Sequence, residues 1–537
     1  MKASELFLRP ATGLIREWSA YDAWIYAFLS VNLVTLGFYI WTFNSFIPAG
    51  NPALATIIAM VFLTLQNVVY ATLICSIPRV GGDYVWQSRI LGGFWGFFLS
   101  WPGWVFCLWL WVPIYGNMLS WLLASPLCAL AGNIDLAIWW CSPMGLFTSS
   151  MIVIAFVFFF VGVGMKLYAR IQKWLFYVAL IGMVLFVISF LTSSITNFVS
   201  VFDSYMANWL PAEGITYQGL VDFALHDPEW GVGEFAPLTG TATGPSFALI
   251  PMLLFWIMWP VWGATLFGEV RGAGDFGRVF KVFQWALILG GVGAIGLWVL
   301  FANTMGWTFY QSLSYSYYVG SGSLQWLSSP PLLAAMLMGG GPLGMLMVIL
   351  MSGWFFAWSG TVFLSSTRVI FASAFDRAFP KPFADVKFRF NTPINALLLM
   401  SLPSVVLTIF YFFIPGWSVL TLDATFAIAI AYFGTTFACM LFPLRRPGLF
   451  KRNPVAKYNV GRIPLVSILS AIYLVFLLYI FWLWAADPVY AVNNPYSAGF
   501  MIFMYILAAA IYFYFKYYRK KKEGIDLARV FEEIPVE

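Results

Sequence analysis

The chain has 537 residues, of which 61% are hydrophobic and only 9% are charged, and its formal net charge at pH 7 is +6. With 27 Trp and 54 Phe, it carries more apolar surface than a water-soluble fold of this length can hide, so we expect the lipid bilayer to be its solvent. A positive net charge is also typical of nucleic-acid-binding proteins, but here the bases are confined to loops beside apolar stretches. We therefore expect no nucleic-acid partner.

The 28 Lys and Arg residues fall into seven clusters, at 2–16, 79–89, 166–173, 271–281, 368–389, 445–462 and 516–529. Each apolar stretch between neighbouring clusters is long enough for one outward and one return helix of about 20 residues. Because basic loops stay on the cytoplasmic side, seven clusters predict six helical hairpins with both termini cytoplasmic. The sequence therefore predicts an all-α polytopic protein of the cell membrane, with spans at 21–47, 53–77, 94–123, 146–165, 174–191, 247–268, 282–305, 343–367, 394–413, 419–444, 464–484 and 499–515.

Two of the predicted outer segments are unusually long. The first, 192–244, holds six acidic residues, the single histidine His226 and no base, and its aromatic content predicts an ordered cap over the outer mouth. The second, 307–342, contains an apolar stretch at 331–338 that is too short to cross a membrane. This stretch is either a separate outer helix that dips back toward the membrane or an outward extension of the eighth span.

Five cysteines are scattered along the chain without the paired spacing of a metal site. Cys128 and Cys141 both fall in the predicted outer loop after the third span. Oxidation outside the cell could join these two in a disulfide, or they could remain packing residues like the other three.

Two predicted spans contain residues that interrupt helices. In the sixth, Pro260 and Gly263 lie close to mid-membrane; proline removes a backbone donor and clashes with the preceding turn, and glycine costs about 1 kcal/mol against alanine. In the first, the stretch 30–37 combines a glycine with polar side chains that compete for backbone hydrogen bonds. Paired interruptions at corresponding positions of two halves predict a transport site at the bilayer centre, whereas simple kinks would explain each span separately.

Ionisable side chains are rare within the predicted spans. A hydrolase or metal enzyme needs convergent His, Asp, Glu or Cys residues at membrane depth, and no such set is present, so we expect no enzymatic activity, no metal and no cofactor. Asp423 is the one acid clearly within a span, near the outer part of the tenth. It either binds a cation or a proton there, or is an interfacial residue wetted from outside.

The loops beside the spans carry motifs of a known family. Residues 78–84 read Pro-Arg-Val-Gly-Gly-Asp-Tyr and resemble the Pro-Arg-x-Gly-Gly-x-Tyr stretch typical of the amino acid-polyamine-organocation superfamily. Residues 368–380, followed by Asn391-Thr392-Pro393, are similar to a second loop of that superfamily, although here Asp376 precedes Arg377. The likeness extends to 16–22 before the first span and 269–271 after the sixth, and it covers spans one to ten.

The resemblance implies a core of ten helices in a five-plus-five inverted repeat, with discontinuous first and sixth helices, two peripheral helices and alternating access. The first span departs from the family because it lacks the compact glycine-rich signature usual there. The expected segments are a cytoplasmic N-terminal segment at 1–20, a first repeat at 21–191, the outer cap at 192–244, a second repeat at 245–444, the peripheral spans within 463–515 and a cytoplasmic tail at 516–537.

A broken helix can bind a zwitterion without buried ions. An amino acid could present its carboxylate to free N–H groups where the first helix resumes, and its ammonium to free carbonyls at the breaks. We therefore expect a secondary active transporter of a neutral amino acid, with its substrate-binding residues at Ser30, Asn32, Thr35, Gly37, Trp256, Trp259, Gly263 and Thr265. An organic cation or polyamine is the alternative substrate, and a channel or membrane receptor built on the same bundle is the alternative of another class.

Ion coupling and gating are expected from the same comparison. The resemblance implies that sodium, if it is used, binds between the first and eighth spans at the level of Thr361 and Ser359; a proton acting through Asp423, or exchange without an ion, is equally open. A cytoplasmic charge latch could form when the pathway closes inward, or the same charges could simply anchor loops; the residues concerned are Arg79, Asp83, Glu269 and Arg271. The expected partners are thus an amino acid, the lipid bilayer and a sodium ion or proton.

Overall fold

The computed structural model describes residues 14–534 except 15, 228–232, 320–321, 387–391, 418–419 and 421–422. Most of the expected N-terminal segment, Asn391 of the second motif and Glu229 of the acidic loop lie outside this part. Within the described residues, twelve helices are long and apolar enough to cross a membrane: Ala20–Phe46, Pro52–Ser76, Gly93–Leu110, Pro143–Gly162, Met165–Leu191, Thr243–Glu269, Phe276–Met305, Pro342–Phe375, Ile394–Phe413, Asp423–Arg445, Leu465–Ala486 and Pro495–Glu523. Each overlaps one predicted span, so the all-α polytopic architecture is confirmed.

Several spans consist of more than one element. The first contains α1 (Ala20–Val31), η1 (Leu33–Gly37), α2 (Phe38–Trp41) and η2 (Thr42–Phe46). The third contains α5 (Gly93–Trp101), η3 (Pro102–Phe106) and η4 (Cys107–Leu110), and it continues through α6 (Val112–Leu119) and η5 (Ser120–Ala124). The sixth joins α13 (Thr243–Ile257) to η6 (Pro260–Glu269), the eighth joins α18 (Pro342–Ser359) to α19 (Thr361–Phe375), and the twelfth joins α24 (Pro495–Tyr518) to η11 (Arg519–Glu523).

The other spans are single helices, namely α3 (Pro52–Ser76), α9 (Pro143–Gly162), α10 (Met165–Leu191), α14 (Phe276–Met305), α20 (Ile394–Phe413), α21 (Asp423–Arg445) and α23 (Leu465–Ala486). Polar residues at their starts explain where several begin. The Ser19 hydroxyl and the Asp22 carboxylate form a capping box at the start of α1. Asn51 caps α3, whose first residue is proline, and Asp275 caps α14.

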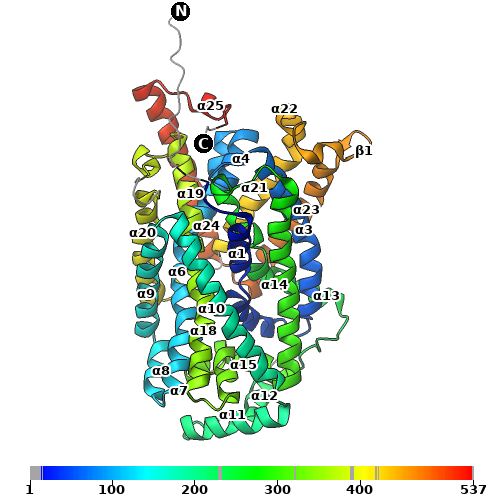
Figure 1. Cartoon of the computed structure of the whole chain (residues 1–537), viewed down its shortest axis with the longest axis vertical. Coiled ribbons are helices and arrows are strands. Elements are labelled where there is room, and N and C mark those ends of the chain that lie inside the picture. Colours follow the sequence, from blue (N-terminus) through cyan, green and yellow to red (C-terminus); the bar gives the residue numbers. More distant parts are fainter. Residues whose placement is uncertain are drawn as a thin grey trace, which may run out of the picture.

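The bundle has two different ends (Figure 1). The end that we call the basic end carries α4 (Gly82–Ile90), η7 (Lys381–Ala384), α22 (Pro447–Phe450), η9 (Pro454–Lys457), the antiparallel pair β1 (Asn459–Val460) and β2 (Ile463–Pro464), and α25 (Leu527–Val530). The opposite end, called the capped end, carries α7 (Ser125–Leu130), α8 (Ile134–Cys141), α11 (Ile195–Trp209), α12 (Tyr217–His226), α15 (Trp307–Val319), α16 (Gly322–Leu327), α17 (Pro330–Leu337) and η10 (Pro488–Tyr490).

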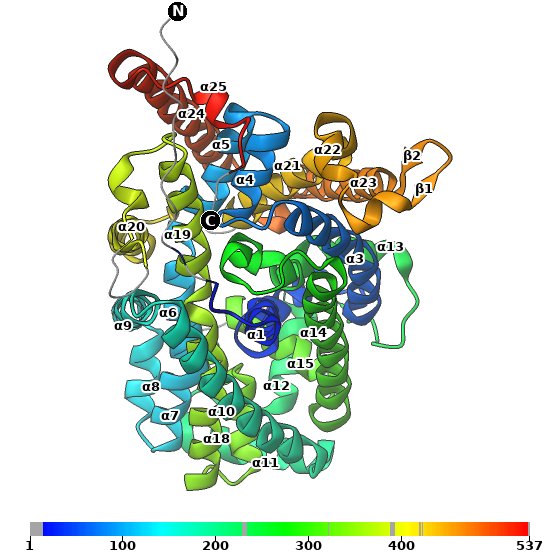
Figure 2. The same cartoon turned by 45° about the horizontal axis from the view of Figure 1, so that its top comes forward.

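The first and sixth spans lie at the centre of the bundle. Buried residues make up 94% of an apolar 18-residue stretch of the first span and 89% of one in the sixth, but only 22% of one in the twelfth. Figure 2 shows α1 inside the bundle, with α10 and α14 beside it. Polar residues on these two spans are therefore enclosed by other helices rather than by lipid.

The helices α10 and α18 touch through their backbones. A Cβ added to Gly182 would lie 2.7 Å from the Met351 nitrogen, and one added to Gly353 would lie 2.8 Å from the Leu175 oxygen. Such close approach is the usual result of small residues at a helix interface in membranes. The fifth and eighth spans are thus joined along their middle.

The capped end is covered by helices, including α11 and α12 from the described part of 192–244. Phe198 and Phe202 of α11 pack against Phe309 of α15, and Tyr217 of α12 stacks on the same ring with centroids 4.2 Å apart. The apolar stretch before the eighth span forms the separate helix α17, which a turn at 338–341 divides from α18. Of the two sequence alternatives, the separate helix is therefore correct.

The possible disulfide between Cys128 and Cys141 is not formed. Both cysteines are free, on α7 and α8 respectively, and the Cys141 sulfur lies 3.4 Å from the Ser125 hydroxyl oxygen. Burial raises the pKa of both thiols above its ordinary value, which keeps them protonated.

Candidate functional site

The first span breaks at Asn32. Its backbone has φ 43° and ψ 92°, a conformation that Asn tolerates better than most residues, and it ends α1 after Val31. The side-chain oxygen of Asn32 accepts hydrogen bonds from the backbone nitrogens of Val34 at 3.2 Å and Thr35 at 2.8 Å. The side-chain nitrogen donates to the Trp354 carbonyl of α18 at 3.0 Å. Asn32 thus caps the π-helical turn η1 and fastens the break to the eighth span.

This cap corrects one expectation from the sequence. The N–H groups where the first helix resumes were expected to be free for a substrate carboxylate, but those of Val34 and Thr35 already have a partner in the Asn32 amide. The reason is local: an Asn side chain reaches the amides two and three residues ahead, as in a helix N-cap. Ser30 also bonds locally, because its hydroxyl donates to the Tyr26 carbonyl at 2.8 Å.

The sixth span breaks between Ile257 and Pro260. The helix α13 ends at Ile257, and the chain then continues as the 3-10 helix η6, as expected where proline lacks an N–H donor. The Trp259 indole donates to the Phe255 carbonyl at 2.7 Å. A Cβ added to Gly263 would lie 2.9 Å from the Tyr26 ring, so this glycine lets η6 pack closely on α1.

Three of the predicted site residues are buried and carry a polar atom that has no hydrogen-bond partner within the described residues. These atoms are the Thr35 hydroxyl, the Trp256 indole nitrogen and the Thr265 hydroxyl. A Cβ added to Gly37 would lie 3.2 Å from that indole nitrogen, which places the two breaks side by side. Buried polar groups normally have partners, so unsatisfied ones next to two helix breaks are candidate ligand contacts.

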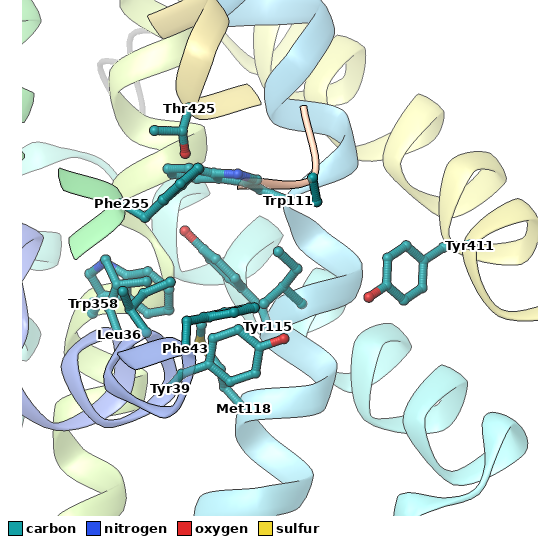
Figure 3. Close-up of a pocket in the computed structure, with 13 residues that line it drawn as sticks. Leu36, Tyr39, Phe43, Trp111, Tyr115, Met118, Phe255, Trp358, Tyr411 and Thr425 are labelled. Atoms are coloured by element: carbon teal, nitrogen blue, oxygen red, sulfur yellow. The ribbon is translucent and has the colours of Figure 1, made fainter. Parts of the chain in front are cut away.

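A cavity of about 260 Å³ opens beside the breaks, toward the capped end (Figure 3). Its walls come mainly from the second half of the first span, from α6 and from single residues of other spans. The 13 lining residues are Leu36, Tyr39, Ile40, Phe43, Trp111, Ile114, Tyr115, Met118, Phe255, Trp358, Tyr411, Thr425 and Ala491. Seven of them are aromatic and none is charged, so the cavity suits an apolar guest or one that needs no counter-ion.

The sequence analysis missed these walls. None of the eight predicted substrate residues lines the cavity, although Leu36 adjoins two of them and Phe255 adjoins a third. The rings of Tyr115 and Trp358 pack with centroids 4.2 Å apart, and Figure 3 shows them together with Trp111 around the space. The many aromatic residues of the third span could have indicated an aromatic cavity wall. The sequence alone does not show which face of this helix meets the first span.

Thr361, one of the two residues predicted for a sodium site, lies at the contact between the eighth span and the first. The Thr361 carbonyl accepts hydrogen bonds from the Tyr26 hydroxyl at 2.8 Å and from the Trp262 indole at 3.1 Å. The Ser359 hydroxyl donates to the Phe356 carbonyl of its own helix at 3.2 Å. Two protein donors therefore occupy the carbonyl that a cation at Thr361 would need.

The predicted latch residues lie near one another at the basic end, but with other partners than expected. Glu269 pairs with Arg368 of α19, whose Nε lies 2.8 Å from the carboxylate, and both side chains are buried. Arg271 donates to the Arg16 carbonyl, and its backbone nitrogen donates to the Trp18 carbonyl. Arg79 donates to the Pro78 carbonyl at 3.1 Å.

A second buried ion pair lies beside the first. The Arg89 guanidinium of α4 binds the Asp376 carboxylate through two bonds, of 2.5 and 2.7 Å. We call Arg368–Glu269 and Arg89–Asp376 the basic-end ion pairs. Sequence reasoning missed Arg368 and Asp376 as partners because each lies about a hundred residues or more from the residue it binds.

Asp423 begins α21 at the capped end and is fully buried. Neither of its carboxylate oxygens has a close hydrogen-bond partner within the described residues. Its neighbour Thr425, whose hydroxyl is likewise unsatisfied, lines the cavity. No group of three or more His, Cys, Asp and Glu residues that could hold a metal ion occurs in the part of the chain that the structure describes.

Comparison with known proteins gives one match. The family model described as amino acid permease matches residues 22–511, a region that includes nearly all of the twelve spans and both breaks. No curated protein sequence matches the chain.

Proposed function

Because the chain belongs to the amino acid permease family, we propose that it is a secondary active transporter that moves a neutral amino acid across the membrane by alternating access. The observation that carries the proposal is the pairing of two helix breaks with an aromatic cavity whose 13 lining residues include no charged side chain. A cationic or anionic side chain on the substrate would find no counter-ion there, whereas an apolar or aromatic one would find matching walls.

The substrate backbone would use the polar groups at the breaks. The Thr35 hydroxyl and the Trp256 N–H are buried and have no hydrogen-bond partner within the described residues, so both can donate to a carboxylate. The amides of Val34 and Thr35 become available as well if the carboxylate displaces the Asn32 side chain. The ammonium group would face carbonyls left without helix partners by the break at Pro260.

The direction of opening follows from the two ends of the bundle. The basic end holds the positively charged loops and is therefore assigned to the cytoplasm, with both termini on that side. The basic-end ion pairs close the bundle there, while the cavity lies toward the capped end. This arrangement corresponds to a state that accepts substrate from the outside, and the inward-open state requires the pairs to part.

The proposed transport is coupled to the movement of an ion, for which sodium and a proton are the two candidates. A sodium ion at Thr361 would have to displace the Tyr26 and Trp262 donors, whereas the buried Asp423 carboxyl, which has no close hydrogen-bond partner among the described residues, can hold a proton. A proton is therefore the favoured coupling ion.

An organic cation is the second candidate substrate. The faces of Trp111, Tyr115 and Trp358 around an uncharged cavity are the kind of surface that binds quaternary or aromatic ammonium groups by cation–π attraction. Such a ligand needs no carboxylate contact, so the occupied amides of Val34 and Thr35 would not oppose it.

Uptake into proteoliposomes tests both candidates. The purified protein is assayed with a pooled panel of labelled amino acids and labelled monoamines and polyamines, with and without imposed sodium and proton gradients. We expect accumulation of one or more neutral amino acids. Accumulation of an amine alone would select the second candidate, and passive flux of inorganic ions without saturable uptake would reject a transporter in favour of a channel.

A further inference from the structure

Among the described residues, no cationic side chain pairs with the enclosed carboxylate of Asp83. It lies in the first turn of α4 and is fully buried. One oxygen accepts from the Tyr70 hydroxyl of α3 and from the Thr435 hydroxyl of α21, each at 2.5 Å, and the other accepts from the Trp104 indole at 3.0 Å. Three neutral donors from three different spans thus converge on one acid.

Four charged side chains on α4 and on the elements packed around it form two ion pairs that leave Asp83 out. Glu269 of η6 pairs with Arg368 of α19, and Asp376 of α19 pairs with Arg89 at the far end of α4. The other titratable groups facing this acid are phenols, Tyr70 of α3 and Tyr432 of α21, whereas Tyr84 of α4 faces the Arg89–Asp376 pair. In the described part of the chain, Asp83 is therefore a buried acid with no counter-ion, which is costly unless the site uses it.

Two rows of aromatic rings link Asp83 to the break in the sixth span. The Trp104 ring packs against Trp262 with centroids 4.6 Å apart, and Trp262 contacts Trp259 at 5.2 Å. On the other side, Tyr70 packs against Tyr432 at 5.5 Å, and Tyr432 contacts Trp259 at 6.2 Å. Both rows end on Trp259, at the residue where α13 gives way to η6.

The loop before Asp83 packs closely against η6, the half of the sixth span after the break. The Gly81 nitrogen donates to the Thr265 carbonyl at 2.9 Å, and a Cβ on Gly82 would lie 3.0 Å from the Thr265 nitrogen. Gly81 and Gly82 both have positive φ, at 102° and 44°, where other residues are strained. A displacement of η6 therefore has to shift α4 and change the enclosure of Asp83.

We propose that Asp83 is the proton-binding group that couples transport to a proton gradient, a role that rests on the proposed transport function. The proton adds to one carboxylate oxygen and gives a neutral carboxyl group whose O–H needs an acceptor. The Thr435 hydroxyl can supply it by rotating, because a hydroxyl both donates and accepts and this one already accepts from the Gln87 side chain at 2.9 Å. Protonation thus reverses the hydrogen bond between Asp83 and Thr435, and the hydrogen of the Thr435 hydroxyl has to turn to another acceptor.

Enclosure and proton affinity are linked in this scheme. Burial raises the pKa of Asp83 to about 6, whereas an aspartate in water has a pKa near 3.8. The hydrogen bonds from its three donors lower the pKa, but by less than burial raises it. The enclosed site therefore binds a proton roughly 100-fold more tightly than a hydrated one. Opening of the basic end lets water reach the loop, which lowers the affinity and releases the proton on that side.

The test uses the full-length protein in proteoliposomes and the labelled amino acid that the wild-type protein accumulates best. For Asp83→Asn, which is permanently neutral, we expect accumulation driven by an imposed proton gradient to fall at least tenfold. Exchange of labelled for unlabelled amino acid without a gradient should remain within about threefold of wild type. The exposed carboxylate variant Asp385→Asn, at the same end, should match wild type in both assays.

A second measurement does not depend on transport. Infrared difference spectra between pH 4 and pH 8 of the purified protein should contain a protonated carboxyl band with a midpoint near 6 that is missing in Asp83→Asn, even if no tested substrate is carried. Gradient-driven accumulation that survives in Asp83→Asn but is lost in Asp423→Asn would overturn the assignment, as would an unchanged carboxyl band. Absence of all uptake by wild type, with the band present, would instead contradict the proposed function alone.

Discussion

The two ends of the bundle are organised in opposite ways. At the basic end, four buried charges are matched in two ion pairs. Near the capped end, a cavity remains, and the groups around it, such as the Tyr115 and Thr425 hydroxyls, have no partner within the described residues. The contrast indicates that one end is stabilised by its own contacts, whereas the other is completed by something the protein binds.

Breaking an ion pair at the closed end should have the largest effect. Arg368→Met leaves the Glu269 carboxylate buried and unpaired, which typically costs about 3–5 kcal/mol. We expect a matching fall in the free energy of unfolding in detergent, and cysteines introduced beside the pair should become more reactive to a water-soluble reagent. The double variant Arg368→Met with Glu269→Met should regain most of the stability. Equal stability of the single variant and wild type would contradict a closed, dehydrated basic end.

The pH dependence of stability tests the enclosed acid at the same end. The folded state holds the Asp83 proton more tightly than the unfolded state, so unfolding releases a proton between pH 4 and pH 6. The stabilisation from this group is complete below about pH 4 and is lost as the pH rises through 6, by about 3 kcal/mol in all. Asp83→Asn should flatten this part of the profile, and parallel curves for the two proteins would exclude a raised pKa.

Substitutions of Asn32 test whether the amides at the break in the first span bind the substrate. Asn32→Gly keeps the positive φ but releases the amides of Val34 and Thr35 and the bond to Trp354, at a cost of about 1 kcal/mol in stability. If the substrate is an amino acid, its carboxylate gains two donors and KM should fall about tenfold. Asn32→Asp is the matched control, because a carboxylate at this place holds the amides more firmly and should raise KM. An unchanged KM in both variants would show that these amides do not contact the substrate.

The smallest effect is expected from the cavity wall. Trp358→Leu removes a ring that packs on Tyr115, and such aromatic contacts are worth about 0.5–1.5 kcal/mol. The KM for uptake should therefore rise about threefold. Trp482→Leu, on a ring that is 61% exposed on the outside of the bundle, should leave KM as in wild type. The comparison of the two Trp variants separates a binding surface from general aromatic packing.

Much of the fold follows from the sequence, because spans and basic loops are local properties. The position of the break in the sixth span was also predicted correctly from Pro260 and Gly263, because proline disrupts the helical turn in which it lies. The contacts between spans could not be predicted from the sequence. Asn32 was identified as a site residue, but its capping role depends on the break it creates. Tyr115 and Trp358 meet only because α6 and the eighth span pack around the first span. The Glu269–Arg368 pair joins positions 99 residues apart, which no local pattern encodes.

The glycine contacts between α10 and α18 have a practical consequence for measurement. With Gly182 against Met351 and Gly353 against Leu175, neither helix can slide past the other without a backbone collision. A pair of spin labels placed across these two helices should therefore report one unvarying separation during turnover. This separation can serve as the fixed reference distance for measuring displacements of the broken first and sixth spans.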